Sequence, residues 1–158
     1  MDWDGWALFG FVATAALTAS MITAQLAGLT RLDFPLALGT FVTEDPDRAR
    51  VVGFFLHLCV GQGFAVGYAA TFALLHRATW WIGALLGILH VGIALTVILP
   101  LLPGVHPHMA SQRAGPASTA VLEPPGLFAL NYGIQTPLVT AVVHVIYGAF
   151  LGLLLHPS

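Results

Sequence analysis

Four long apolar stretches without any Asp, Glu, Lys or Arg limit what this chain can fold into. They occupy residues 6–29, 51–75, 80–102 and 137–155. A helix of about 20 residues, rising about 1.5 Å per residue, spans the roughly 30 Å hydrocarbon core of a bilayer. The sequence therefore predicts an all-α fold, a four-helix transmembrane bundle that forms a single integral membrane domain over residues 1–158.

Composition excludes most soluble classes of protein. The chain has 158 residues, of which 58% are hydrophobic and 8% are charged, whereas soluble domains carry about 25% charged residues. A chain of this length is too short to hide its apolar stretches in a soluble core. Its formal net charge is −2, so it lacks the basic field that nucleic-acid binding requires. The expected environment is the lipid bilayer, with no nucleic-acid partner.

The lengths of the connections predict the topology. Only residues 76–79 separate the second and third apolar stretches, so we expect these two helices to be antiparallel neighbours. The two long connections, residues 30–50 and 103–136, then lie together on the opposite membrane face. Asp45 and Thr136 each precede a proline, the pattern of a helix N-cap, so we expect the second and fourth helices to begin there.

Arginine counts predict an orientation. Four arginines flank the long connections and one, Arg77, flanks the short one; the four are Arg31, Arg48, Arg50 and Arg113. Cytoplasmic loops carry the excess of positive charge. We therefore expect the long connections in the cytoplasm and both termini outside, in a bacterial inner membrane.

The two halves of the chain share a short pattern that predicts an internal duplication. Leu32-Asp33-Phe34-Pro35 leads to a helix carrying His57-Leu58-Cys59-Val60-Gly61, and Leu122-Glu123-Pro124-Pro125 leads to a helix carrying His144-Val145-Ile146-Tyr147-Gly148. The pattern fits two helical hairpins related by a pseudo-twofold axis along the membrane normal. Chance similarity is the open alternative, because the first and third helices show no comparable match.

Three histidines are the ionisable residues inside the predicted spans, where such residues are rare and mark function. They are His57, His90 and His144. Each shares a helix face with small residues, and such faces let helices approach closely. We therefore expect all three imidazoles to face inward, with His57 and His144 at matched depth, beside a polar stripe of Thr14, Thr18 and Gln25.

Several roles remain open for these histidines. Each can simply hydrogen-bond a neighbouring helix, or they can bind a cofactor, since imidazole ligates haem iron and other metals. Haem or another macrocycle between His57 and His144 is the first cofactor candidate, with His90 nearby. A bare metal ion is the second, for which the candidate ligands in the connections are His106, His108, Asp33 and Glu123.

The sequence contains no nucleotide-binding glycine loop, catalytic Ser or Cys elbow, or HExxH pair, so it does not indicate an enzyme. We expect a non-catalytic structural or accessory subunit of a larger membrane protein assembly, packed against other transmembrane helices as a homo- or hetero-oligomer. Two alternatives are a histidine-ligated haem, pigment or metal-binding membrane protein, and a small channel or transporter.

Overall fold

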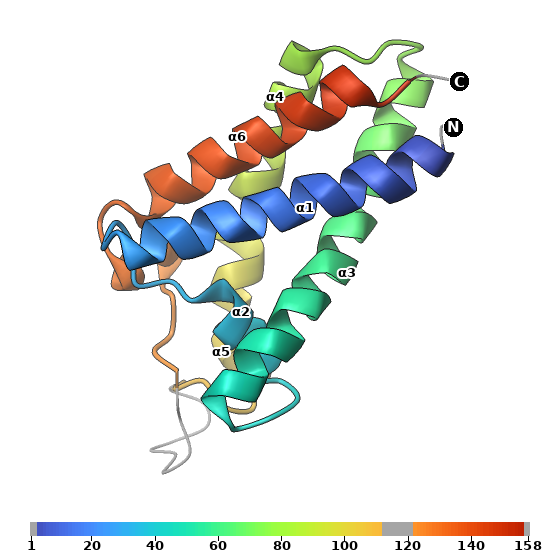
Figure 1. Ribbon diagram of the computed structural model, residues 1–158. Helices are drawn as coiled ribbons and strands as arrows, with labels where there is room; N and C mark the ends of the chain where they lie inside the picture. Colours follow the sequence, from blue (N-terminus) through green and yellow to red (C-terminus); the bar gives the residue numbers. More distant parts are fainter. Residues whose placement is uncertain (1–2, 112–121, 157–158) are drawn as a thin grey trace.

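The computed structural model describes residues 3–111 and 122–156, and its regular structure over these ranges is helical (Figure 1). Four segments are long and apolar enough to cross a membrane: Trp3–Leu26, Pro46–Leu74, Trp80–Val105 and Thr136–Leu154. The predicted all-α class and the four predicted apolar helices are thereby confirmed.

The first, second and fourth of these segments are single helices, α1, α3 and α6. The third is not one continuous α-helix. It consists of α4 (Trp80–Ile93), a π-helical segment η1 (Ala94–Ile98) and α5 (Leu99–Val105). Its helical backbone therefore runs past residue 102, where the predicted span ended.

The helix starts differ in how well the sequence predicted them. Asp45 is the N-cap of α3, and its carboxylate accepts from the backbone N–H of Asp47 and Arg48 at 3.1 and 2.9 Å. The helix consequently begins at Pro46, ahead of the apolar stretch. The helix α6 also begins where the sequence predicted, at Thr136, but Thr136 does not cap it. Gln135 occupies the N-cap position without a side-chain hydrogen bond, and the Thr136 hydroxyl pairs with that of Thr30 at 2.7 Å.

Two short helices lie in the long connections, where no apolar periodicity predicted them. The first, α2 (Phe34–Gly39), begins at Asp33, whose carboxylate accepts from the Leu36 N–H at 2.9 Å. The second is a 3₁₀ segment, η2 (Leu127–Tyr132), in which two non-glycine residues have a φ of 56°. Both segments pack against the transmembrane helices.

Glycines bring α4 and α6 into backbone contact. A Cβ added at Gly83 would lie 1.9 Å from the Gly148 carbonyl oxygen, and one added at Gly148 would lie 2.0 Å from that of Gly83. One turn further, a Cβ at Gly87 would lie 2.4 Å from the His144 carbonyl oxygen. The helices approach this closely because small residues line the contact, as is common between membrane helices.

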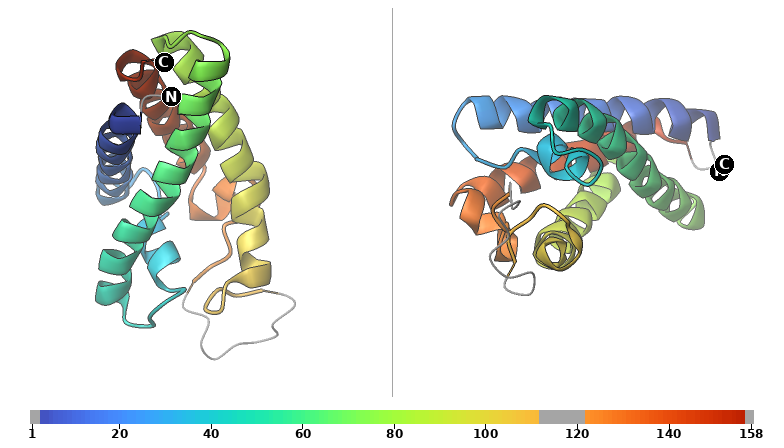
Figure 2. Two further views of the ribbon diagram at one scale, coloured as in Figure 1. Left: turned by 90° about the vertical axis from the view of Figure 1, so that its right-hand side faces the viewer. Right: turned by 90° about the horizontal axis from the view of Figure 1, so that it is seen from below.

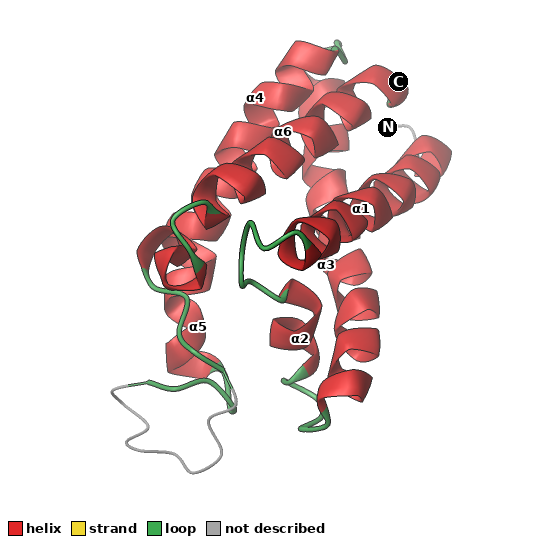
Figure 3. Cartoon of the chain, turned by 60° about the vertical axis from the view of Figure 1, so that its left-hand side comes forward, coloured by secondary structure: helices red, strands yellow, loops and turns green. Residues whose placement is uncertain are grey.

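The other helices pack on α6 and on one another. α1 packs on both α3 and α6 (Figure 1), and its Thr14 hydroxyl would lie 2.2 Å from a Cβ at Gly61 of α3. α2 lies beside the first turns of α3 (Figure 3), where a Cβ at Gly53 would lie 1.7 Å from the Pro35 carbonyl oxygen. Glycine thus permits close approach at each of these contacts.

The helices α3 and α4 diverge from the short connection that joins them (Figure 2). Both chain ends lie at the end of the molecule near this connection, whereas α2 and α5 lie at the other end (Figure 1). Side chains from both α3 and α4 line a cavity.

Candidate functional site

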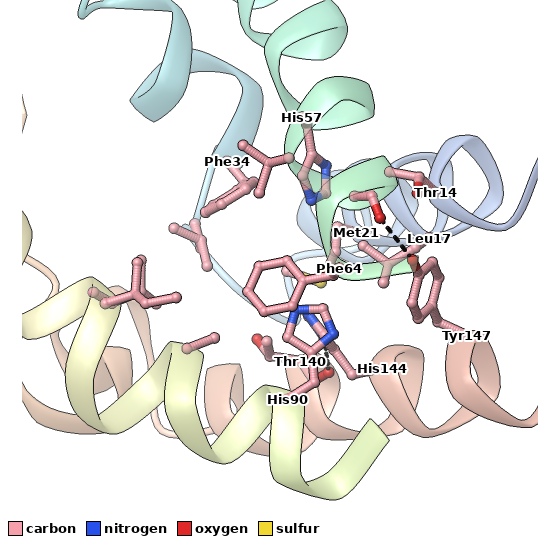
Figure 4. A pocket seen from close by; sticks show the side chains of 16 residues that line it. Thr14, Leu17, Met21, Phe34, His57, Phe64, His90, Thr140, His144 and Tyr147 are labelled. Atoms are coloured by element: carbon pink, nitrogen blue, oxygen red, sulfur yellow. Dashed lines mark hydrogen bonds between the residues drawn. The ribbon is translucent and has the colours of Figure 1, made fainter. Parts of the chain in front are cut away.

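The structure brings the three intramembrane histidines to one cavity (Figure 4). His57 reaches it from α3, His90 from α4 and His144 from α6. The cavity has a volume of about 80 Å³ and is partly open. Its lining is otherwise largely apolar and includes Leu17, Met21, Leu32, Phe34, Val60, Phe64, Ala94, Ile98 and Leu99.

His57 is held by α1 and by the connection that follows it. Its Nδ1 lies 2.8 Å from the Thr18 hydroxyl oxygen. The Phe34 ring meets the imidazole edge to face, with ring centroids 4.7 Å apart. These contacts fix the orientation of an imidazole that is 8% exposed.

His144 and His90 meet across the glycine-rich contact of α4 and α6. Their ring centroids are 4.7 Å apart and the rings are nearly perpendicular, at 89°. The Nδ1 of His144 donates to the Thr140 carbonyl oxygen at 2.7 Å. His90 stacks on Phe64, with ring centroids 3.8 Å apart, and its Nδ1 lies 3.4 Å from the Tyr68 hydroxyl.

The open side of the cavity lies between α3 and η1. Val60 of α3 and Ile98 of η1 both line the cavity, yet they are 44% and 39% exposed. No other residue that lines the cavity is exposed, so we place the opening between these two segments, whose helices diverge from their short connection (Figure 2). A π-helical turn next to His90 is also notable, because such turns occur frequently at functional sites.

The cavity is small for the macrocycle predicted from the sequence. It holds about 80 Å³, whereas a cavity of about 150 Å³ takes up benzene. A haem between His57 and His144 would therefore require the helices to move apart. Within residues 3–111 and 122–156, no three His, Cys, Asp or Glu side chains lie close enough together to hold a metal ion.

His106, one of the metal candidates, already uses both ring nitrogens. Its Nε2 donates to the Ala37 carbonyl oxygen at 2.9 Å, and its Nδ1 accepts from the His108 backbone N–H at 3.1 Å. Burial lowers the pKa of His106 below its ordinary value, which favours the neutral ring. This histidine ties the end of α5 to α2.

The other metal candidates from the connections have separate partners. Asp33 accepts from the Arg50 guanidinium at 2.8 Å, and Glu123 pairs with Arg31 at 3.1 Å. His108 lies 3.8 Å from a carboxylate oxygen of Glu44. The structure thus spreads these side chains over different contacts and does not gather them at one point.

Sequence reasoning overlooked the aromatic side chains of the cavity. Phe64 follows His57 by two helical turns and Tyr147 follows His144 by one, so helical spacing alone could have placed both on the histidine faces. Tyr147 donates to the Gly61 carbonyl oxygen at 3.0 Å. Gln25, which we expected on the polar stripe, instead lines a separate surface pocket.

No known protein family matches the sequence, and no curated protein or solved structure was found to be similar to the chain.

Proposed function

We propose that this chain is a non-catalytic, membrane-embedded binding protein for a small lipid-soluble molecule, which it holds with His57, His90 and His144. The cavity that these three histidines share is the observation that carries the proposal. Polar nitrogens left unpaired in hydrocarbon cost several kcal/mol in typical cases, about 2–7. A bound molecule that pairs with them recovers part of that free energy.

The apolar residues at the open side of the cavity favour a ligand that enters from the bilayer. Between α3 and η1 the lining consists of apolar side chains such as Val60, Phe64 and Ile98, which suit hydrocarbon better than a hydrated solute. The cavity of about 80 Å³ has room only for the polar end of such a ligand, which would reach the imidazoles while the apolar body remains outside the cavity, in the opening between the two helices. Ligand pockets commonly combine such a lining with a few convergent polar groups.

The other functions predicted from the sequence remain proposals. Apolar outer faces suit lipid and neighbouring protein helices equally well, so an accessory subunit stays a prediction. Haem, pigment or metal ligation and passage of a solute depend on the same three histidines and stay predictions too. The same holds for the bundle arrangement with an internal pseudo-twofold axis, and for a bacterial inner membrane with cytoplasmic long connections.

The test is to identify what the protein carries. The chain is purified from its native membrane in mild detergent, and small molecules are extracted from it and quantified by mass spectrometry. Val60→Trp places a large side chain at the open side of the cavity. Val97→Trp is the matched control, because Val97 is 48% exposed, close to the 44% of Val60, but does not line the cavity.

The proposal expects about one extracted molecule per wild-type chain, its loss in Val60→Trp and its retention in Val97→Trp. An empty wild-type protein, or equal amounts in both variants, would overturn it. An absorption spectrum of the same sample addresses the haem alternative, which expects a Soret-type band that disappears in His57→Ala or His144→Ala. Co-purifying chains identified in the same preparation address the accessory-subunit alternative.

A further inference from the structure

We propose that the ligand presents hydrogen-bond donors to the cavity, as a lipid-soluble alcohol or diol does, and that ethers and ketones of the same shape are rejected. This inference rests on the proposed binding function and adds the chemical class of the ligand. It follows from the hydrogen bonds of the polar groups around the cavity, whose hydroxyl and ring N–H hydrogens are already donated within the protein.

The Thr18 hydroxyl determines which nitrogen of His57 carries the proton. This hydroxyl lies 2.7 Å from the Thr14 carbonyl oxygen and 2.8 Å from the Nδ1 of His57. It has a single hydrogen, and the carbonyl can only accept, so that hydrogen lies toward Thr14. The Nδ1 of His57 must then be the donor to Thr18. In the neutral ring this leaves Nε2 as a bare acceptor.

His144 also carries its proton on Nδ1, but its hydrogen-bond partner is a backbone carbonyl. Its Nδ1 lies 2.7 Å from the Thr140 carbonyl oxygen, which can only accept, so Nδ1 carries the proton. The Nε2 of His144 is therefore a second bare acceptor. His57 and His144 are each 8% exposed, and neither Nε2 has a hydrogen-bond partner among the described residues.

Each hydroxyl that lines the cavity already donates its one hydrogen to a backbone carbonyl oxygen. Thr14 donates to the Gly10 carbonyl oxygen, Thr140 to that of Thr136 and Tyr147 to that of Gly61. Only His90 keeps its proton position open, because the Tyr68 hydroxyl beside its Nδ1 can donate or accept. The cavity therefore offers acceptors in excess of donors, and a ligand that only accepts finds few partners.

The experiment compares three probes of equal chain length that carry two, one and no donor hydrogens. They are a decanediol with vicinal hydroxyls, decanol and methyl decyl ether, each added to the protein in lipid nanodiscs. Binding is followed by nitrogen NMR of protein labelled at the histidine ring nitrogens. The Nε2 resonances of His57 and His144 report directly on whether a hydrogen is donated to them.

We expect affinity to fall in the order diol, alcohol, ether, with about a tenfold loss for a missing hydrogen bond. His57→Asn should weaken diol binding by about the same factor, while His76→Asn, at the exposed short connection, should not. The probe series in the wild-type protein decides the question even where His57→Asn does not fold.

Three outcomes would overturn the inference, and they differ in what else they affect. An ether that binds as tightly as the diol excludes the donor class but leaves the binding function standing. Zinc ions that shift both Nε2 resonances, where the probes do not, indicate a metal site instead. If neither the probes nor zinc perturb the cavity resonances, the proposed binding function fails together with the inference.

Discussion

At the scale of single residues, the contact between Thr18 and His57 links two helices and also sets the chemistry of the cavity. The Thr18 hydroxyl bonds its own helix at the Thr14 carbonyl and accepts from the imidazole of α3. A threonine in the first apolar stretch is unremarkable by itself. Its importance follows from its distance of 2.8 Å to a histidine that is 39 residues away in the chain.

Thr18→Val should remove the acceptor for His57 while preserving the shape of the side chain. We expect a loss of unfolding free energy of about 1 kcal/mol. The proton on the His57 ring should also no longer favour Nδ1. Denaturation in mixed micelles measures the first effect, and nitrogen NMR of the ring measures the second. Thr23→Val is the control, because Thr23 is exposed and bonds the Ala19 carbonyl oxygen of its own helix; equal effects of both variants would contradict the prediction.

His106 should make the stability of the protein depend on pH. Burial lowers its pKa below the ordinary value of 6.5, so the unfolded chain takes up this proton at a higher pH than the folded chain. The stabilisation is complete above about pH 6.5 and is lost as the pH falls further. His106→Gln should therefore flatten the decline of the melting temperature with acidification. A decline as steep as that of the wild-type protein would show that His106 does not contribute.

At the scale of helices, the glycine contact between α4 and α6 is what brings His90 beside His144. A Cβ added at Gly87 would lie 2.4 Å from the His144 carbonyl oxygen. The two backbones are therefore in contact within one turn of both histidines. The small-residue faces were visible in the sequence as a recurrence at helical spacing. That these two faces meet each other backbone to backbone is decided by the packing.

Gly83→Ala should disrupt this helix pair. The added methyl group would lie 1.9 Å from the Gly148 carbonyl oxygen, and relieving such a clash costs about 1–3 kcal/mol of unfolding free energy. Gly92→Ala, on the same helix, is the matched control, because nothing lies within 4 Å of its added Cβ. Denaturation in mixed micelles should show a loss of stability for the first variant alone, and a stable Gly83→Ala protein would contradict the close contact.

At the scale of the whole molecule, the ends of the helices predict which segments share a membrane face. Asp47 lies in the first turn of α3, and Arg77 lies in the short connection beyond its last turn. If α3 spans the bilayer, these two residues are on opposite sides. The arginine distribution further predicts that Arg77 lies outside the cytoplasm.

Labelling of single cysteines tests this topology. Asp47→Cys and Arg77→Cys are made in a Cys59→Ser background, since Cys59 is exposed on the surface of α3. An impermeant maleimide applied to spheroplasts should modify the cysteine at position 77, and should modify that at position 47 only after lysis. The reverse pattern would overturn the orientation but preserve the fold. Labelling of both positions from one side would contradict a spanning α3.

The sequence by itself determined the parts of this protein that depend on local composition. Uncharged apolar stretches specify helices that can span a bilayer, because backbone groups in hydrocarbon must be paired within the segment. Asp45 before Pro46 likewise marked the start of α3, since a cap depends on neighbouring residues only. The presence of histidine on small-residue faces could be read in the same way.

The tertiary structure alone decided how these parts meet. The contacts of α2 and the pairing of Thr30 with Thr136 depend on residues distant in sequence, so no local pattern indicates them. The same is true of the cavity, which is lined by side chains from α1, α3, α4 and α6 together, including His57, His90 and His144. Single oxygen atoms decide which ring nitrogen carries the proton. For His57 it is the Thr18 hydroxyl on a neighbouring helix, and for His144 it is the Thr140 carbonyl one turn earlier on the same helix.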